Sequence, residues 1–423
     1  MSSSLVISGK RLVICTVGGV PHRSVGASVV LFYHYISKFK SMAFNIVHLH
    51  INEVNKSNIV MLNEYSRDME EKDSFRIIVH NVDYFNKISG LKREIVFSIL
   101  PNEIIQRIRN FDPELTFCFD IFAAGILGHI VACPKIVWIG DLNFQTFLYH
   151  ALYSARERIR DVIKLPSVWL LCRSWKDAYK KILSDFNLVV VASKSSELAL
   201  SKLGIYSKYL PYPWAVSENI NAPSVKTRHS IPSYLFFGTL SALGSRSAFH
   251  YLLHSIYPKV IQLYGRGSFQ IFMCGLRDLP EWVRKELTKC PEIIFLGFVE
   301  DLSALMCTCH AVIVPIDIPV GNRSRIITAM ALGGLVIAHK NTSLSNPELI
   351  NGVTCYLAVD SNHFVEHMRI AYEKPDLSES IIEKAREVYN KTYRPDVSTK
   401  IMAAEIVKIL EMEYAKSQQD RLS

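Results

Sequence analysis

The sequence predicts an α/β protein with two doubly wound, Rossmann-like domains whose mostly parallel sheets face a central cleft. Three observations indicate this class. Short apolar runs of strand length recur throughout the 423 residues, segments with helical spacing separate them, and both halves of the chain show this alternation. Most runs are continuous rather than alternating, as expected for strands that helices cover on both faces. Because ligands of open α/β sheets bind at the carboxyl ends of the strands, two facing sheets predict a shared site.

The first domain is predicted to span residues 1–216. Six apolar runs are its expected strands: Leu12–Val17, Asn45–His50, Arg76–His80, Leu115–Phe119, Lys135–Ile139 and Leu188–Ala192. His48 and His50 lie inside the second run, which favours a structural role for both. Residues 217–230 are polar and show no periodicity, so we interpret them as the linker between the domains.

The second domain, residues 231–385, repeats the design. Its expected strands are Tyr234–Phe237, Phe269–Met273, Ile293–Leu296, Ala311–Val314 and Leu335–Ala338. Helical spacing recurs between them, at Ala248–Gln262, Glu281–Lys289, Asp301–Cys307 and Arg325–Leu332. Residues 386–423 are predicted to be helical, with an interruption at Tyr393-Arg-Pro395, and we expect them to pack back across the first domain.

Composition narrows the class of protein. Apolar residues make up 49% of the chain and charged residues 21%, which excludes a disordered protein, and 48 basic against 39 acidic residues give a net charge of +9. The nine cysteines are scattered, as free thiols in a reducing cytosol would be. Lys10 and Arg11 interrupt the apolar N-terminus, and no apolar run reaches about 18 residues, so neither a signal peptide nor a spanning helix is expected. These features predict a cytoplasmic protein.

Several common catalytic motifs are absent from the sequence. It contains no Gly-x-Gly-x-x-Gly, no Walker A loop, no His-Glu-x-x-His and no Gly-x-Ser-x-Gly. The sequence therefore lacks the main motif that would indicate a dinucleotide oxidoreductase, a P-loop NTPase, a zincin or a serine hydrolase. Cys307-Thr-Cys309-His310 suggests a metal site, but no second pair lies at zinc-site spacing and the motif runs into an expected strand. Ordinary core thiols are the favoured interpretation, and no metal site is expected.

The most informative stretch follows the predicted strand that ends at Pro315. A loop with Gly321, Asn322, Arg323 and Ser324 precedes a helix with strong helix formers. The first turn of a helix presents unbonded N–H groups and the positive end of the helix dipole, so this loop is suited to a phosphate or diphosphate. Arg323 and Arg325 add bidentate phosphate donors. The alternative from spacing alone is two surface arginines at a solvated helix start.

The run Arg325-Ile-Ile-Thr-Ala-Met-Ala-Leu-Gly-Gly-Leu-Val-Ile, followed by Asn346-Pro-Glu-Leu-Ile-Asn-Gly352, resembles the donor domain of the GT-B glycosyltransferases, especially the retaining family 4, or group 1, type. Phe236-Phe-Gly-Thr-Leu240 and Phe295-Leu-Gly-Phe-Val-Glu-Asp-Leu302 are similar to two further elements of that domain, in the same order. The resemblance covers nearly the whole chain and is strongest over residues 290–352. It implies an acceptor-binding first domain and a donor-binding second domain.

The resemblance also implies a set of donor-binding residues. These are Gly238, Arg246, Phe298, Val299, Gly321, Asn322, Arg323, Ser324, Arg325, Thr328 and Glu348. The family's Glu-x7-Glu falls on Val320 and Thr328, so both of its carboxylates are missing, and Arg246 is the nearest cation to stand in for the family's diphosphate-binding lysine. An arginine-based diphosphate site is the interpretation we prefer. The alternative role of Glu348 is an exposed cap of a helix starting at Pro347.

Candidate catalytic and acceptor residues lie in the first domain. An inverting transfer needs a base to deprotonate the acceptor hydroxyl, and Asp141, which follows a predicted strand where the family has His-Asp, is the best placed. Asp120 and His22 are the other catalytic candidates, and Gly18, Gly19 and His129 are expected to contact the acceptor. The alternative for the strand-end aspartates is helix capping.

Residues 151–183 combine basic and aromatic side chains at helical spacing. Such helices can lie on anionic membrane surfaces, although an amphipathic helix packed on the first domain, with its lysines in water, is the favoured alternative. Nucleic-acid binding has no recognisable module.

The resemblance implies a glycosyltransferase that moves a sugar from a nucleotide donor, UDP- or GDP-linked, to a saccharide or lipid-linked acceptor in surface polysaccharide assembly. No cofactor is expected beyond the nucleotide sugar as co-substrate. Within the cytoplasm, the protein is further expected to bind peripherally to the inner face of the membrane. Two alternatives stay open, namely an inactive relative that binds nucleotide or glycan and a GT-B sugar-nucleotide epimerase.

Overall fold

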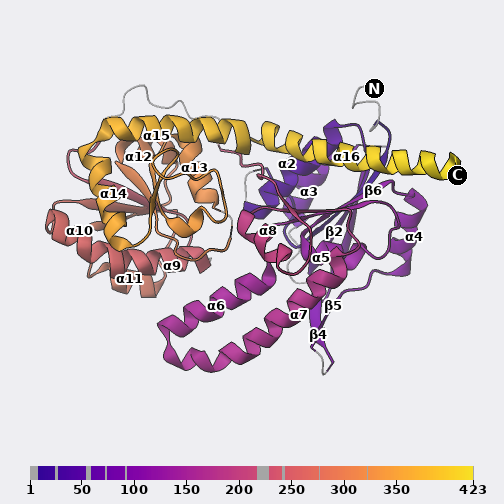
Figure 1. Ribbon diagram of the computed structural model, residues 1–423, viewed down its shortest axis with the longest axis horizontal. Helices are drawn as coiled ribbons and strands as arrows, with labels where there is room; N and C mark the ends of the chain where they lie inside the picture. The colour runs from indigo at the N-terminus through magenta and orange to yellow at the C-terminus, as the bar shows by residue number, and fades with distance from the viewer. Residues whose placement is uncertain are drawn as a thin grey trace. The chain divides into compact units, whose positions relative to one another are not determined.

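The computed structural model describes residues 8–23, 27–53, 59–71, 74–90, 93–216, 228–240, 243–275, 277–321 and 323–422. The chain divides into two compact units (Figure 1). Unit 1 consists of residues 1–215 with 395–423, and unit 2 of residues 216–394. Most of the predicted linker, residues 217–227, lies outside the described residues. In the part of the chain that is described, no helix is both long and apolar enough to cross a membrane.

Unit 1 contains a parallel seven-stranded sheet in the order β3-β2-β1-β6-β7-β8-β9. Its strands are β1 (Arg11–Val17), β2 (Asn45–Glu53), β3 (Phe75–Val82), β6 (Leu115–Phe119), β7 (Lys135–Ile139), β8 (Leu188–Val191) and β9 (Lys208–Tyr209). All six predicted strands are confirmed. The short β9 and the antiparallel hairpin of β4 (Asn86–Ser89) and β5 (Glu94–Phe97) were not predicted, because they are short and only partly buried.

Helices cover both faces of this sheet (Figure 1). They are α2 (Ala27–Ser41), α3 (Ile59–Met69), α4 (Asn102–Phe111), α5 (Asp120–Leu127), α6 (Asn143–Glu157), the 3-10 turn η2 (Ile159–Lys164), α7 (Leu165–Leu183) and α8 (Lys194–Ser201). The chain returns to unit 1 with α16 (Pro395–Leu422), which packs against α2. Nζ of Lys208 lies 2.9 Å from Oε2 of Glu405 and links α16 to β9. The return therefore begins at Pro395, and residues 386–394 belong to unit 2.

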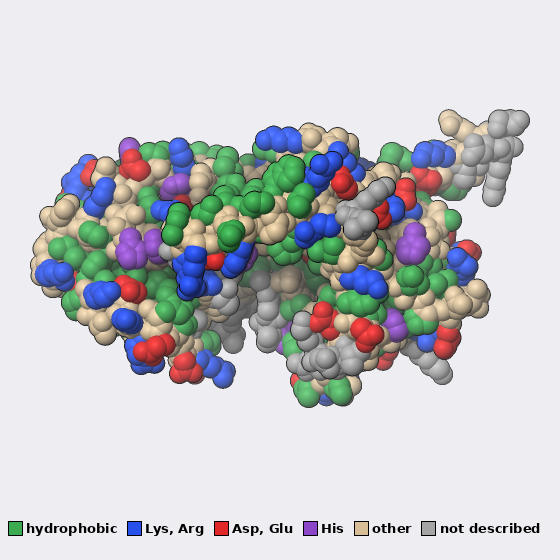
Figure 2. Space-filling model, turned by 90° about the horizontal axis from the view of Figure 1, so that it is seen from below, with side chains coloured by type: hydrophobic (Ala, Val, Ile, Leu, Met, Phe, Trp, Pro, Cys, Tyr) green, Lys and Arg blue, Asp and Glu red, His purple; other side chains and the backbone are tan. Residues whose placement is uncertain are grey.

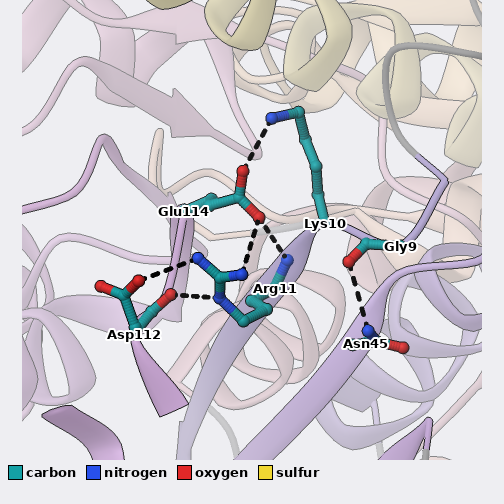
Figure 3. A network of polar contacts seen from close by, with 6 residues as sticks. All are labelled: Gly9, Lys10, Arg11, Asn45, Asp112 and Glu114. Carbon is teal, nitrogen blue, oxygen red and sulfur yellow. Dashed lines mark hydrogen bonds and ion pairs between the residues drawn. The ribbon is translucent and has the colours of Figure 1, made fainter. Parts of the chain in front are cut away.

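Polar contacts align the first strand of unit 1 with its neighbours (Figure 3). Nη2 of Arg11 lies 2.9 Å from Oδ2 of Asp112, and the Arg11 backbone N–H donates to Oε2 of Glu114 at 3.1 Å. Nζ of Lys10 contacts the other oxygen of Glu114 at 2.9 Å, while the Asn45 amide donates to the carbonyl of Gly9. These bonds join β1 to the starts of β6 and β2 at the amino edge of the sheet, which leaves the opposite, carboxyl edge for the site.

Buried polar side chains link β1 and β2 to α3. The Thr16 hydroxyl lies 2.8 Å from both Nε2 of His48 and Nδ1 of His50, and the Tyr65 hydroxyl lies 2.9 Å from Nδ1 of His48. Burial lowers the pKa of His48 well below its ordinary value and that of His50 to about 4. Both histidines are therefore neutral at physiological pH and belong to the core, as their place within a strand indicates.

Acid is expected to loosen β2. A histidine in the unfolded chain titrates near pH 6.5, so between about pH 6.5 and 4 the opened strand binds more protons than the folded one. The stability of β2 is complete above about pH 6.5 and falls as the pH drops, and the opening equilibrium rises by up to about tenfold per pH unit for each histidine. Amide exchange of residues 45–53 at pH 7 and pH 5, corrected for intrinsic rates, measures this change.

Replacing both His48 and His50 with glutamine is expected to remove the pH dependence of that exchange. Replacing the exposed His254 of unit 2 with glutamine is the control and should leave it in place. Equal opening of β2 at the two pH values in the unmodified protein would contradict the assignment of the histidines as buried neutral groups.

Unit 2 contains a parallel six-stranded sheet in the order β12-β11-β10-β13-β14-β15. Its strands are β10 (Ser233–Phe237), β11 (Gln270–Cys274), β12 (Ile293–Gly297), β13 (Ala311–Val314), β14 (Val336–His339) and β15 (Tyr356–Ala358). The five predicted strands are confirmed, two of them shifted by one residue, and the three-residue β15 was not predicted.

The helices of unit 2 lie on both faces of its sheet (Figure 1). They are α9 (Leu243–Tyr251), the π-helix η3 (Leu252–Ile256), α10 (Tyr257–Tyr264), α11 (Glu281–Leu287), α12 (Leu302–Thr308), α13 (Ser324–Leu332), the 3-10 turn η4 (Lys340–Thr342), α14 (Ser361–Glu373), α15 (Pro375–Val388) and the π-helix η5 (Tyr389–Tyr393). The helix predicted over Ala248–Gln262 is thus continuous but contains a π-turn, just before Pro258 in the first turn of α10.

The Cys307-Thr-Cys309-His310 motif lies in the core of unit 2. Both cysteines are buried, and Nδ1 of His310 accepts a hydrogen bond from the Ser233 backbone N–H at 3.1 Å. Burial lowers the pKa of His310 to about 4. Within the described ranges, no group of three or more potential ligands could hold a metal ion.

Candidate active site

The candidate donor site lies at the carboxyl edge of the sheet in unit 2. β10 and β13 are neighbours in this sheet, and the chain winds from them in opposite directions, through β11 and β12 on one side and β14 and β15 on the other. Such a switch point leaves a crevice outside the strand ends, where ligands of doubly wound sheets bind. Gly238 follows β10 at this point, and residues 315–321 and 323 lie between β13 and α13.

Arg325 joins the loops on the two sides of the switch point. Its Nη2 donates to the carbonyl oxygen of Thr239 at 2.8 Å and also to the hydroxyl of Ser245 on α9. Gly238 has a φ of +109°, and a Cβ at this position would collide with Nε of Arg325. Only glycine therefore allows the guanidinium to lie against this turn.

A second arginine lies beside the first. Arg323 is only 3% exposed, and it donates to the carbonyl oxygens of Val320 at 2.8 Å and Ile318 at 2.6 Å, so it shapes the loop after β13. Desolvation, followed by the charge of Arg323, lowers the pKa of Arg325 to about 10, which leaves it a cation at neutral pH. Among the described residues, Arg325 forms no ion pair with a carboxylate. Two adjacent cations make the potential of this crevice positive, which suits an anionic ligand.

Most other predicted donor-site residues lie at the same edge of the sheet. Phe298 and Val299 follow β12, and the Phe298 ring is 68% exposed, so its face is accessible to a nucleotide base. Gly321, with a φ of +96°, lies in the loop after β13, Ser324 begins α13, and the half-buried Thr328 lies one turn further along that helix.

Arg246 differs from the arginine pair in its surroundings. The side chain of Arg246 is exposed, and its guanidinium carbon lies 5.6 Å from the centroid of the Trp282 ring on α11, whereas the preceding Ser245 is buried against Arg325. Its role as substitute for the family's lysine stays a prediction. Asn322 lies outside the described residues.

Glu348 is held in place by a tyrosine that the sequence marked only as a helix interruption. The hydroxyl of Tyr393, a fully buried residue of η5, donates to Oε2 of Glu348 at 2.7 Å and accepts from Nδ2 of Asn346 at 2.9 Å. Residues 346–350 form a turn and no helix, so the alternative that Glu348 caps a helix starting at Pro347 is wrong. Nothing in the sequence pattern linked Tyr393 to Glu348, since 45 residues separate them.

Replacing Tyr393 with phenylalanine is expected to remove one hydrogen bond from the Glu348 carboxylate while keeping the ring in the core. The loss of a hydrogen bond to a charged group, and the buried Asn346 amide left without it, should lower the stability of unit 2 by about 1–3 kcal/mol. Binding of a nucleotide sugar should weaken more than binding of the nucleoside diphosphate alone, because Glu348 is expected near the sugar or ribose. Thermal unfolding and calorimetric titration measure the two effects, with the exposed Tyr206→Phe as control. Unchanged stability and sugar binding would contradict this role.

In unit 1, two carboxylates follow neighbouring strands at the carboxyl edge. Asp120 begins α5 directly after β6, and Asp141 follows β7. Asp120 has a φ of +77°, a strained backbone conformation that non-glycine residues keep mainly at functional positions. Desolvation, opposed by a hydrogen bond from the Ile121 backbone N–H and assisted by the charge of Asp141, raises the pKa of Asp120 to about 7. A carboxylate that titrates near neutrality is suited to general-base catalysis, while Asp141 is exposed.

His22, Gly18 and Gly19 lie after β1, on the other side of the switch point in unit 1. His22 lines a cavity of about 320 Å³ between this loop, α2 and α3, and its Nε2 lies 3.4 Å from Oε2 of Glu64. The backbone N–H of Gly18 donates to the carbonyl of Ile51 at 2.8 Å. A Cβ on Gly19 would lie 2.5 Å from Val29, so the glycine permits α2 to approach the loop.

His129 is separated from these residues. It follows α5 at the end opposite Asp120, beyond an eight-residue helix of about 12 Å. It lines a different cavity, of about 450 Å³, formed by β5, α5 and the last turns of α7. His129, which we expected to contact the acceptor with Gly18 and Gly19, therefore lies apart from them, because α5 carries the chain back toward the amino edge of the sheet.

Comparisons with known proteins agree with the geometry of unit 2. Residues 231–374 match the family model described as glycosyl transferases group 1, whereas no curated protein matches the sequence. The structure is similar to sucrose-phosphate synthase from Thermosynechococcus elongatus, with a TM-score of 0.62 and 14% identity over 95% of this chain and 100% of that chain.

Two further solved structures are similar over most of the chain. HepE from Anabaena, in complex with UDP, has a TM-score of 0.62 and 12% identity over 94% of this chain and 100% of that chain. TarM from S. aureus, in complex with fondaparinux, α-GlcNAc-glycerol and UDP, has a TM-score of 0.60 and 10% identity over 95% of this chain and 99% of that chain. These likenesses confirm the predicted GT-B fold. The chain therefore has the GT-B fold, and residues 231–374 of its second unit match the model of the group 1 glycosyl transferases.

Proposed function

We propose that this enzyme transfers a sugar from a nucleoside diphosphate sugar to a hydroxyl of a saccharide or lipid-linked acceptor. The observation that carries the proposal is the arginine pair at the switch point of unit 2. Arg325 is cationic and half-buried, and Arg323 lies beside it. A departing diphosphate carries negative charge, and preorganised cations with helix N–H groups stabilise such charge in the transition state. UDP is the first donor nucleotide to test, since HepE and TarM both bind it.

The proposal assigns each unit a part of the reaction. Unit 2 binds the donor, with Phe298 against the base, Arg325 near the diphosphate and Glu348 near the sugar or ribose hydroxyls. Unit 1 binds the acceptor, and Asp120 accepts the proton of the attacking hydroxyl, because its pKa near 7 allows it to take up a proton at neutral pH. Surface polysaccharide assembly is the pathway we propose for the product.

A thermal-shift panel of UDP, GDP, CDP and ADP and their sugars tests the donor assignment. A ligand at 100 times its dissociation constant stabilises the folded state by about 2.7 kcal/mol, which corresponds to roughly 5–10 °C for a unit of this size. A shift with one nucleotide, followed by its release from the nucleotide sugar in the presence of a glycan acceptor, supports transfer. The absence of a shift with every nucleotide would overturn the proposal.

The same assay separates the alternatives. The missing carboxylates at Val320 and Thr328 favour an inactive relative as the second candidate, which predicts a thermal shift without any turnover. An epimerase would instead release an isomerised sugar without any acceptor.

A further inference from the structure

A helical hairpin with two different halves extends from unit 1. It consists of α6, η2 and α7 (Figure 1). The second half of α7 packs on the core through a stripe at helical spacing, formed by Cys172, Trp175, Ala178, Tyr179 and Leu183. Lys180 and Lys181 are exposed to water, as expected for the packed amphipathic helix that we favoured from the sequence. This half anchors the hairpin in the domain.

In the other half of the hairpin, the partly buried Val168 and Leu171 pack against the core, and the other described side chains are exposed or half-buried. No side chain described between residues 152 and 171 is buried, although many are apolar. Ile159 is 85% exposed, Ile163 83% and Trp169 59%. Leu152, Val162 and Leu170 are exposed beside them. We call these six side chains the apolar tip. Apolar side chains gathered at one exposed place, with a polar rim, indicate an interaction surface.

Basic side chains border the apolar tip. Arg156, Arg158, Arg160 and Lys164 are all exposed, whereas the acidic residues in the same stretch are Glu157 and Asp161. Asp161 pairs with Lys164 at 2.7 Å. Figure 2 views the molecule from the side on which the hairpin lies and shows apolar side chains over it with basic groups at the edges. The border of the tip is therefore net positive.

We infer that the apolar tip inserts into the headgroup region of an anionic lipid bilayer. Exposed aliphatic side chains and a tryptophan suit the boundary between headgroups and acyl chains, and the arginine and lysine side chains reach anionic headgroups while their stems cover apolar surface. A second copy of the chain suits the apolar tip less well. In a two-fold symmetric contact the basic borders of the two copies would face each other, and their like charges would repel. The inference goes beyond the proposed transfer reaction and stands without it.

Flotation of the purified full-length protein with vesicles tests the inference. We expect binding to phosphatidylcholine vesicles containing about a quarter phosphatidylglycerol, and little binding to phosphatidylcholine alone. The Ile159→Ser/Ile163→Ser variant should bind the anionic vesicles at least about tenfold more weakly, because it removes two apolar side chains from the membrane. The Arg158→Gln/Arg160→Gln variant should bind more weakly and depend less on salt.

Matched controls separate the tip from exposed residues elsewhere. Ile59→Ser/Val60→Ser removes two aliphatic side chains that are exposed on α3, and Arg284→Gln/Lys285→Gln removes two exposed cations on α11. Neither control should change vesicle binding. All four variants should keep the thermal shift with the donor nucleotide, so a failure of the membrane inference is distinguishable from a failure of the proposed function.

Quenching of tryptophan fluorescence by brominated lipids measures insertion directly. Anionic vesicles should quench the unmodified protein, and Trp169→Phe should lose most of that quenching while the folded protein is retained. No binding to anionic vesicles would overturn the inference. Vesicle binding that the serine variant leaves unchanged, or quenching that Trp169→Phe leaves unchanged, would also overturn it. A dimer in sedimentation that the serine variant makes monomeric would do so as well.

Discussion

Replacing Asp120 with asparagine is expected to lower kcat for sugar transfer by about 10²–10⁴, the usual contribution of a general base. Asparagine has nearly the same shape and tolerates a positive φ, so the strained turn at the start of α5 should be kept. Donor binding, which is assigned to unit 2, should not change. The measurement is steady-state kinetics with a saturating nucleotide sugar, once the thermal-shift panel has identified it.

The pH dependence of the rate gives an independent test of the same residue. Asp120 acts as a base only when it is ionised, and its pKa is about 7, so the rate should rise with pH through about 7 and then level off. The asparagine variant should lose that rise. The exposed Asp185→Asn in unit 1 is the control and should leave both kcat and the profile unchanged. If Asp120→Asn keeps most of its activity while Asp141→Asn loses it, the base is Asp141.

Replacing Arg325 with glutamine is expected to weaken binding of the donor nucleoside diphosphate by about 10–100-fold. The change removes a cation that lies beside Arg323, and a hydrogen bond to a charged group contributes about 1.5–3 kcal/mol. The corresponding nucleoside lacks phosphates, so its affinity should change little. Isothermal titration with both ligands measures the difference between the two losses.

Two further variants make the arginine test specific. Arg325→Lys keeps the charge but loses the planar guanidinium that reaches Thr239 and Ser245. Its affinity for the nucleoside diphosphate should therefore lie between those of the glutamine variant and the unmodified protein. Arg284→Gln, on the exposed surface of α11, should bind the diphosphate normally. Equal losses for nucleoside and nucleoside diphosphate would assign Arg325 a purely structural role in joining the two loops.

Much of the fold follows from the sequence alone. The central strands are continuous apolar runs, because helices bury them on both faces, and such runs need no knowledge of distant residues to be recognised. The strands that the sequence did not predict are β4, β5, β9 and β15, which have two to four residues each. Segments this short carry too little periodicity to be recognised, even where the partner strand is close in the sequence, as in the hairpin of β4 and β5.

The candidate site could likewise be predicted only in part from the sequence. The sequence determined the residue types of the donor loop, with Arg323 and Arg325 before a helix, because that signal lies within a few consecutive residues. It could not decide whether Arg325 is a surface cation or, as the structure shows, a half-buried one held by Thr239 and Ser245, which lie about 80 residues away. It ranked Asp141 above Asp120, since burial and the positive φ that distinguish Asp120 arise only when β6 and α5 pack in the domain.

The sequence by itself determined the α/β class, the strand order along the chain and the local charge and motif content, since each of these depends on short-range patterns. The tertiary structure alone decided which of those residues meet. It placed Tyr393 on Glu348, moved His129 away from the strand ends, and divided residues 151–183 into a packed half and an exposed half. The physical reason is that burial and hydrogen-bond partners are properties of contacts between distant segments, which a local pattern does not encode.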